Sequence, residues 1–164
     1  MVCMNQAFPA DQARFLLKTS ALSAISCGYA IYRGHTHLVF VPGSVLLTSL
    51  NYWRNPCTKS WRRTLDIGVV YGSLTYQIYM TRGAQYANCY YGIILVCGLC
   101  YYGSSYYYKK QEYWKSAYCH SMIHILGNIS NMILYYGNMI TNYTIEEFVN
   151  LVIGHFNSPM ERYR

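Results

Sequence analysis

Hydrophobic and polar positions along the chain form five long apolar segments separated by short polar breaks. The segments contain few charged residues and cover residues 15–32, 36–53, 65–81, 83–102 and 114–136. Each is about 17 to 23 residues long, which is the length that a helix needs to cross a hydrocarbon core of about 30 Å. The pattern predicts an all-α fold, a polytopic membrane helix bundle with about five transmembrane helices.

One further helical pattern follows the fifth segment. The stretch TIEEFVNLVIGHF, near 144–156, places Thr144 and Glu147 at the spacing of a capping box. We expect a short amphipathic helix here that lies at the membrane interface or packs beneath the bundle. Residues 1–164 are then a single integral membrane domain with this helix in its C-terminal tail.

The composition agrees with the membrane class. Hydrophobic residues make up 53% of the 164 residues and charged residues only 12%, and 20 residues are tyrosine. A soluble protein of this size usually carries more surface charge. Tyrosine rings suit both membrane interfaces and helix bundles. The mean hydropathy of +0.05 hides the apolar segments, because the scale counts tyrosine as mildly polar.

The basic residues divide unequally between the two ends of a five-helix bundle. Nine lie at the end that holds the N-terminus, namely Arg14, Lys18, Arg54, Lys59, Arg62, Arg63, Lys109, Lys110 and Lys115. Four lie at the other end, namely Arg33, Arg82, Arg162 and Arg164. The positive-inside rule then predicts a cytoplasmic N-terminus and an exoplasmic or lumenal C-terminus. This clustering in loops accounts for the net charge of +7, so we expect no nucleic-acid partner.

Polar residues inside the apolar segments are costly in a membrane, and they mark candidate functional positions. Ser49 lies near the cytoplasmic end of the second segment, and Asp66 lies in the first turn of the third. His120 and His124 lie one helical turn apart near the start of the fifth. The predicted topology therefore brings these four side chains to a similar depth on one side of the membrane.

Such a set is suited to metal-assisted hydrolysis. Two imidazoles at positions i and i+4 can bind Zn²⁺ together, and Asp66 is the candidate third ligand beside His120 and His124. The metal would lower the pKa of a bound water and make it a nucleophile. In the catalytic roles, Asp66 would take a proton and the hydroxyl of Ser49 would stabilise an oxyanion. A substrate that enters from the bilayer would be a lipid amide or ester.

The layout resembles the membrane-hydrolase superfamily of alkaline ceramidases, progestin/adiponectin receptors and GPI-anchor-remodelling proteins. That superfamily carries Ser-x-x-x-His near the end of its second helix, an Asp at the start of the third and His-x-x-x-His early in the last. This chain reads SLNYW at 49–53, RRTLDI at 62–67 and HSMIH at 120–124. The resemblance implies a zinc-dependent lipid hydrolase of divergent, shortened form, with five helices where the family has seven. Trp53 stands where the family has its first His.

Other interpretations of the same residues stay open. The two histidines belong equally well to a small-and-polar packing seam with Gly127, Asn128 and Asn131. Asp66 is equally suited to cap the third helix or to pair with Arg62 or Arg63. If Asp66 binds a metal, it is not also a free base, so the site has too few ligands for the family chemistry. The alternatives are a non-catalytic membrane scaffold, a subunit that binds other membrane subunits, and a haem-binding subunit.

Overall fold

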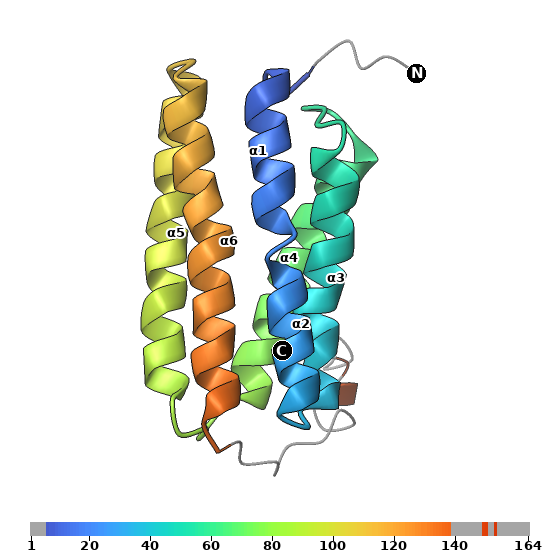
Figure 1. The fold of residues 1–164 in the computed structure, drawn as a ribbon, viewed down its shortest axis with the longest axis vertical. Coiled ribbons are helices and arrows are strands. Elements are labelled where there is room, and N and C mark those ends of the chain that lie inside the picture. Colours follow the sequence, from blue (N-terminus) through green and yellow to red (C-terminus); the bar gives the residue numbers. More distant parts are fainter. Residues whose placement is uncertain (1–5, 139–148, 151–152, 154–164) are drawn as a thin grey trace, which may run out of the picture.

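The computed structural model describes residues 6–138, 149–150 and 153, and they form an all-α bundle. Six helices follow one another in this part of the chain (Figure 1). They are α1 (Ala10–Ser20), α2 (Ser23–Tyr32), α3 (Thr36–Trp53), α4 (Trp61–Met80), α5 (Ala87–Lys109) and α6 (Tyr113–Tyr136). The predicted all-α fold is confirmed.

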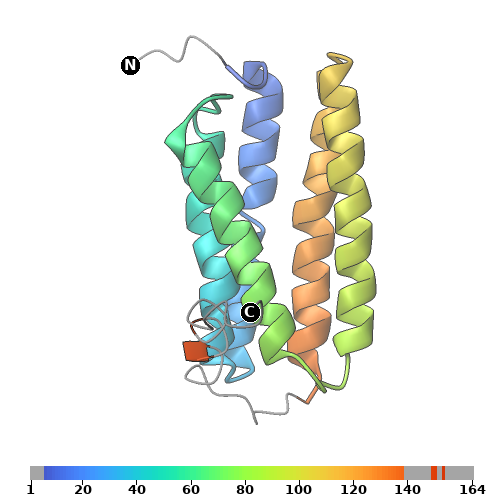
Figure 2. The ribbon, with the colours of Figure 1, turned by 180° about the vertical axis from the view of Figure 1, so that it is seen from behind.

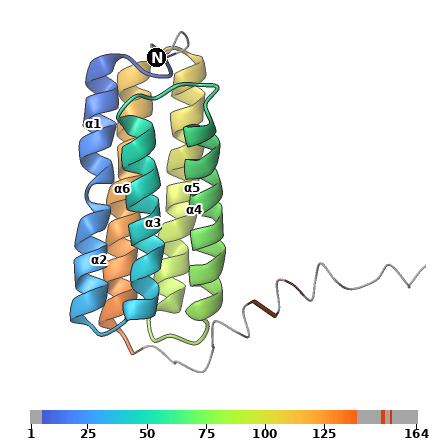
Figure 3. The same ribbon diagram turned by 90° about the vertical axis from the view of Figure 1, so that its right-hand side faces the viewer.

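The first two helices run end to end as one rod, so that the six helices form five rods (Figures 1 and 3). The sequence predicted a single helix over 15–32, and the structure divides it after Ser20. The hydroxyls of Thr19 and Ser20 both donate to the backbone carbonyl of Leu16, at 3.1 and 2.7 Å. Because hydroxyl groups that bond back to the preceding turn bend helices, these two residues account for the break.

The other helices follow the prediction, with shifts at their ends. α4 begins at Trp61, four residues earlier than predicted, because the side chain of Ser60 caps the helix by accepting from the backbone N–H of Arg63 at 3.3 Å. α5 begins only after a turn at Gly83, whose φ of +77° favours glycine. The helix predicted near 144–156 lies almost entirely outside the described residues.

The rods are arranged as two pairs that α1 and α2 connect. α3 packs on α4 and α5 packs on α6, while α1 and α2 contact both α3 and α6. α4 has little contact with α5 or α6, and Figure 2 shows these elements apart on the side that faces the viewer. One seam of the bundle is therefore loosely packed.

The helices differ in length along the chain. α3 has 18 residues, α4 has 20, α5 has 23 and α6 has 24. At a rise of 1.5 Å per residue they extend over roughly 27 to 36 Å. Within the described residues, none of the helices combines the length and the apolar character that a membrane span requires.

The bundle places many polar groups inside and large apolar groups outside. The buried polar residues include Ser20, Ser23, Ser26, Ser49, Ser73, Gln77, Thr81, Ser104, Ser116, Asn128 and Ser130. The exposed apolar residues include Ile31, Phe40, Leu47, Leu95, Leu99 and Ile129. Apolar clusters at the two ends of the bundle complete the interior, one around Trp53 and Leu16 and the other around Leu134 and Tyr135. The middle of the interior is the polar part.

We predict that the interface between α5 and α6 tolerates no large side chain at position 104. Ser104 is buried there, and Ser116 donates to its carbonyl oxygen at 2.8 Å. Ser104→Leu should lower the free energy of unfolding by about 1 to 3 kcal/mol, the usual cost of overpacking. Ser105→Leu, at the half-exposed neighbouring position, is the matched control. Thermal unfolding followed by circular dichroism measures both, and equal stabilities would contradict this packing.

Candidate functional site

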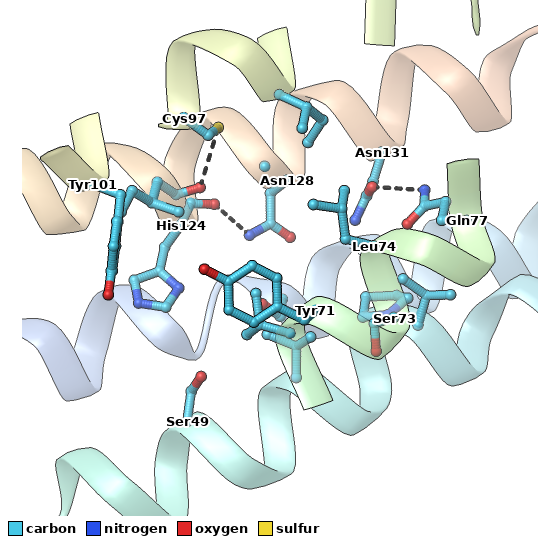
Figure 4. A pocket seen from close by; sticks show the side chains of 18 of the residues that line it. Ser49, Tyr71, Ser73, Leu74, Gln77, Cys97, Tyr101, His124, Asn128 and Asn131 are labelled. Carbon is cyan, nitrogen blue, oxygen red and sulfur yellow. Dashed lines mark hydrogen bonds between the residues drawn. The ribbon is translucent and has the colours of Figure 1, made fainter. Parts of the chain in front are cut away.

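A cavity of about 320 Å³ lies inside the bundle at mid-height, and all five rods line it. Figure 4 shows this cavity with polar side chains on several of its walls. The polar residues that line it are Ser23, Ser49, Asp66, Tyr71, Ser73, Gln77, Tyr90, Tyr101, His120, His124, Asn128 and Asn131. The four candidate residues from the sequence are all among them. The structure therefore brings Ser49, Asp66, His120 and His124 to one cavity.

Asp66 is held by two hydroxyl groups of α3. Ser49 donates to Asp66 Oδ1 at 2.7 Å, and Thr48 donates to the same oxygen at 2.9 Å. Ser49 is almost fully buried, with 2% of its surface exposed. Hydrogen bonds to an ionised acceptor are the stronger kind, so this contact fixes the carboxylate against α3. The adjacent Thr48 is a functional position that the sequence analysis missed, because a lone threonine in a helix is a common packing residue.

The pairing considered between Asp66 and a neighbouring arginine is wrong in the described structure. Arg62 donates to the backbone carbonyl of Asn55 at 3.0 Å, and Arg63 donates to that of Thr58 at 3.3 Å. Both guanidinium groups therefore bind the loop between α3 and α4. The carboxylate of Asp66 is left for the interior of the bundle.

The two histidines lie side by side on α6, with ring centroids 5.3 Å apart. The Nε2 atom of His124 lies 3.3 Å from the hydroxyl of Ser20, within hydrogen-bonding distance. The carbonyl of His124 accepts from the side chain of Asn128 at 2.6 Å. The break between α1 and α2 thus supplies the partner for His124, a role for Ser20 that no sequence pattern indicated.

Trp53 lies directly behind His120. The two ring centroids are 5.0 Å apart, and the indole also packs on Phe8 and Tyr52. Trp53 is 4% exposed and is not among the residues that line the cavity. The superfamily that the sequence resembles has a histidine at this position, and in this chain the indole fills the space.

The described residues do not complete a zinc site. No three side chains of the types His, Cys, Asp and Glu come together in the described structure in a way that holds a metal ion. Zinc in a catalytic site usually has three protein ligands, and here His120 and His124 are two. Asp66 lines the same cavity, but its contacts are with the hydroxyls of α3. The residues in place therefore do not fit the metal, and no hydrolytic step through zinc follows from them.

The cavity reaches the outside of the bundle along the loosely packed seam. Tyr71 of α4 and Tyr101 of α5 both line the cavity, and they are 62% and 47% exposed. Val70, which also lines it, is 38% exposed. Because these side chains line the cavity and are also exposed, they mark a lateral opening between α4 and α5.

The remaining histidines of the described chain, His35 and His37, do not line the cavity. His35 and His37 flank the turn between α2 and α3, with ring centroids 6.5 Å apart. Burial lowers the pKa of His35 below its ordinary value, so the uncharged imidazole is favoured there. Both lie at the opposite end of the bundle from His120. They supply no ligand to the candidate site.

No protein family, no curated protein and no solved structure matches this chain. The resemblance to membrane hydrolases therefore depends on the four residues in the cavity, on their order along three helices and on the contacts between them.

We predict that Trp53→His creates a zinc site that the wild-type chain lacks. The new imidazole would stand one helical turn after Ser49 on α3 and beside His120, giving three imidazoles with His124. The purified variant should contain about one zinc per chain by mass spectrometry of the metal, whereas the wild type and the control Trp53→Phe should contain far less. Circular dichroism checks that each variant is folded. Equal zinc content in all three proteins would show that the cavity is not related to the family's metal centre.

Proposed function

We propose that this chain is an integral membrane protein whose interhelical cavity binds the polar group of an uncharged membrane lipid. The observation that carries the proposal is the carboxylate of Asp66, which lies with two imidazoles inside a cavity that opens sideways through an apolar outer surface. A water-facing bundle usually shows the reverse arrangement, with its charged groups outside. The proposal has two parts, the membrane and the ligand.

The outer surface supports the membrane part. Leu95 and Leu99 of α5 are 73% and 71% exposed, and Phe40 and Leu47 of α3 are 73% and 71% exposed. Exposed aliphatic and aromatic side chains of this size are costly in water at about 25 cal/mol per Å². The average hydropathy of these helices also counts their inward serine, glycine and tyrosine residues, but a bilayer meets only the outward faces. The outward faces are the apolar ones.

Aromatic residues at both ends of the bundle support the same conclusion. Where α5 meets α6, Tyr106 is 45% exposed and Trp114 is 45% exposed. At the other end Tyr136 is 61% exposed, and its ring stacks on Tyr86 at 6.3 Å. Tyr32, at the end of α2, is 82% exposed. Tyrosine and tryptophan are enriched at both interfaces of a membrane, where a ring meets lipid and its polar atom meets water.

The chemistry of the cavity supports an uncharged ligand. No lysine or arginine is among the described residues that line it, and Asp66 is the acidic residue there. A phosphate or carboxylate group would be repelled by Asp66 with no cation to compensate. A hydroxyl or amide group can donate to Asp66 and exchange hydrogen bonds with His120. A lipid with hydroxyl or amide groups is therefore the ligand class that fits.

A second candidate function is lipid ester or amide hydrolysis by a metal-dependent site. The contact between Ser49 and Asp66 beside His120 and His124 favours it, because the same residue types lie together in the superfamily that the sequence resembles. The site holds two imidazoles and lacks the third, so we place binding ahead of catalysis. In either case other membrane subunits are possible partners for the exposed apolar faces.

We predict that a lipid with hydroxyl or amide groups copurifies with the protein and depends on Asp66. Asp66→Asn should lower its occupancy about tenfold or more, because a hydrogen bond to a charged group contributes about 1.5 to 3 kcal/mol. Asp11→Asn, at the exposed start of α1, is the matched control. Native mass spectrometry from mild detergent measures the occupancy. Equal lipid content in the wild type and in both variants would refute lipid binding at this site.

We predict that the end of the bundle that holds the N-terminus faces the cytoplasm. The loop between α3 and α4 and the turn between α5 and α6 lie at this end, with most of the basic residues. A tag before residue 1 should be cleaved by protease added to sealed, right-side-out microsomes, and a tag after residue 164 should be protected. Cys57, at the same end, is disulfide-bonded. Because such bonds persist in oxidising compartments, this bond favours the inverted orientation, and the same assay decides between the two. Protection of the N-terminal tag alone would show the inverted orientation, and equal accessibility would refute the odd number of spans.

A further inference from the structure

The lower part of the cavity holds a second polar group, formed by Gln77 of α4 and Asn131 of α6. The Nε2 atom of Gln77 donates to Asn131 Oδ1 at 2.9 Å and to the hydroxyl of Tyr135 at 3.4 Å. Gln77 is 2% exposed and Tyr135 is fully buried. These bonds bridge α4 and α6 at a level where the two helices have little other contact. The bridge uses the nitrogen of the Gln77 amide and the oxygen of the Asn131 amide, and leaves the other polar atom of each amide.

The other half of each amide faces the cavity. In the described structure no hydrogen bond uses the Oε1 atom of Gln77 or the Nδ2 atom of Asn131. Figure 4 shows both atoms on the same side of the pair, toward the space between α4 and α6. If both amides were turned over, the free atoms would be a nitrogen on Gln77 and an oxygen on Asn131. Either arrangement presents one donor and one acceptor side by side.

A mainly apolar stretch separates this pair from the upper polar group of the cavity, which consists of Asp66, His120 and His124. Asn131 follows His124 by seven residues and Gln77 follows Asp66 by eleven, which corresponds to roughly 10 and 16 Å along their helices. Between the two levels the cavity wall includes the apolar side chains of Val70, Leu74 and Ile94. It also includes Ser73 and Asn128, whose polar groups already bond to other residues of the bundle. The cavity thus offers polar groups at both of its ends, with a mainly apolar wall between them.

We propose that Gln77 and Asn131 form a second binding subsite, which recognises an uncharged hydroxyl or amide group partway along the chain of the ligand. Its ligand is an amphiphile with two uncharged polar groups, separated by an apolar stretch of roughly 10 to 16 Å. A lipid with a single polar end would leave the free polar atoms of the buried Gln77 and the half-buried Asn131 without partners, which disfavours its binding. The assignment rests on the proposed function, because it needs a lipid whose first polar group lies at Asp66.

Linear alcohols test the subsite directly in the full chain purified in mild detergent. Dodecanediol carries a hydroxyl at each end, dodecanol carries one, and hexanediol has two that are too close together to reach both levels. Dodecanediol should bind about tenfold more tightly than dodecanol by native mass spectrometry, as expected for one or two added hydrogen bonds. Hexanediol should bind more weakly than either. Equal affinities for dodecanediol and dodecanol would overturn the proposal.

Two variants test whether Gln77 and Asn131 cause the tighter binding of dodecanediol. Gln77→Met and Asn131→Leu should each remove the preference for dodecanediol while leaving the affinity for dodecanol within about threefold. Thr75→Val is the matched control, because Thr75 is exposed on the same helix as Gln77. A preference for dodecanediol that survives in both Gln77→Met and Asn131→Leu would overturn the assignment to this pair. Because the comparison of alcohols in the wild type needs no substitution, it holds even if one variant does not fold.

The same measurements separate this proposal from the function on which it rests. Dodecanol binding that is lost in Asp66→Asn supports the upper site, whatever the second hydroxyl contributes. If dodecanol binds in that way but dodecanediol binds no better, only the second subsite is refuted. If neither alcohol binds, both the lipid-binding function and the subsite are refuted.

Discussion

The carboxylate of Asp66 sets the organisation of this bundle, because a charged group inside helices with apolar outer faces must have strong partners. Ser49 and Thr48 supply two hydroxyl donors to one of its oxygens, both from α3. An unpaired buried charge is strongly destabilising, so these bonds hold α4 against α3 near one end. At the other end Gln77 joins α4 to α6. Between these two attachments α4 stands away from α5, and the cavity opens there.

Small polar residues let the other described helices pack closely. Ser104 and Ser116 meet between α5 and α6, and the hydroxyl of Ser26 bonds to the amide of Asn128 between α2 and α6. Short side chains let helices approach closely, and each hydroxyl finds an acceptor on the neighbouring helix. The seam between α4 and α5 is joined near one end by a long side chain, because the hydroxyl of Tyr91 donates to the carbonyl of Ile78 at 3.3 Å. Farther along, this seam carries the large side chains of Tyr71 and Tyr101. The opening therefore lies where close helix contacts are missing.

The sequence predicted the parts of this structure that depend on the lengths of the apolar segments and on the alternating direction of the helices. Five apolar segments of sufficient length implied five rods, and alternating chain direction brought Ser49, Asp66 and the two histidines to one level. It did not predict the break after Ser20, because that break depends on where hydroxyl groups turn within an otherwise helical pattern. It also did not predict Thr48 as a partner of Asp66. Rotation of a helix about its axis decides which of two adjacent hydroxyls faces a neighbour, and here both do.

The indole of Trp53 fills the position at which the superfamily that the sequence resembles has a histidine. It packs between Phe8 and His120, and its Nε1–H is buried with no hydrogen-bond partner in the described structure. Leaving a buried donor unpaired costs about 1 to 3 kcal/mol. The tryptophan at this position therefore stabilises the bundle by filling space and not through its polar atom. The volume is the one that a third imidazole would need. With that place filled, His120 keeps its hydrogen-bonding groups for a ligand, while His124 contacts the hydroxyl of Ser20. Asp66 as an acceptor and His120 in the same cavity are the groups on which the proposed binding of a lipid hydroxyl or amide depends.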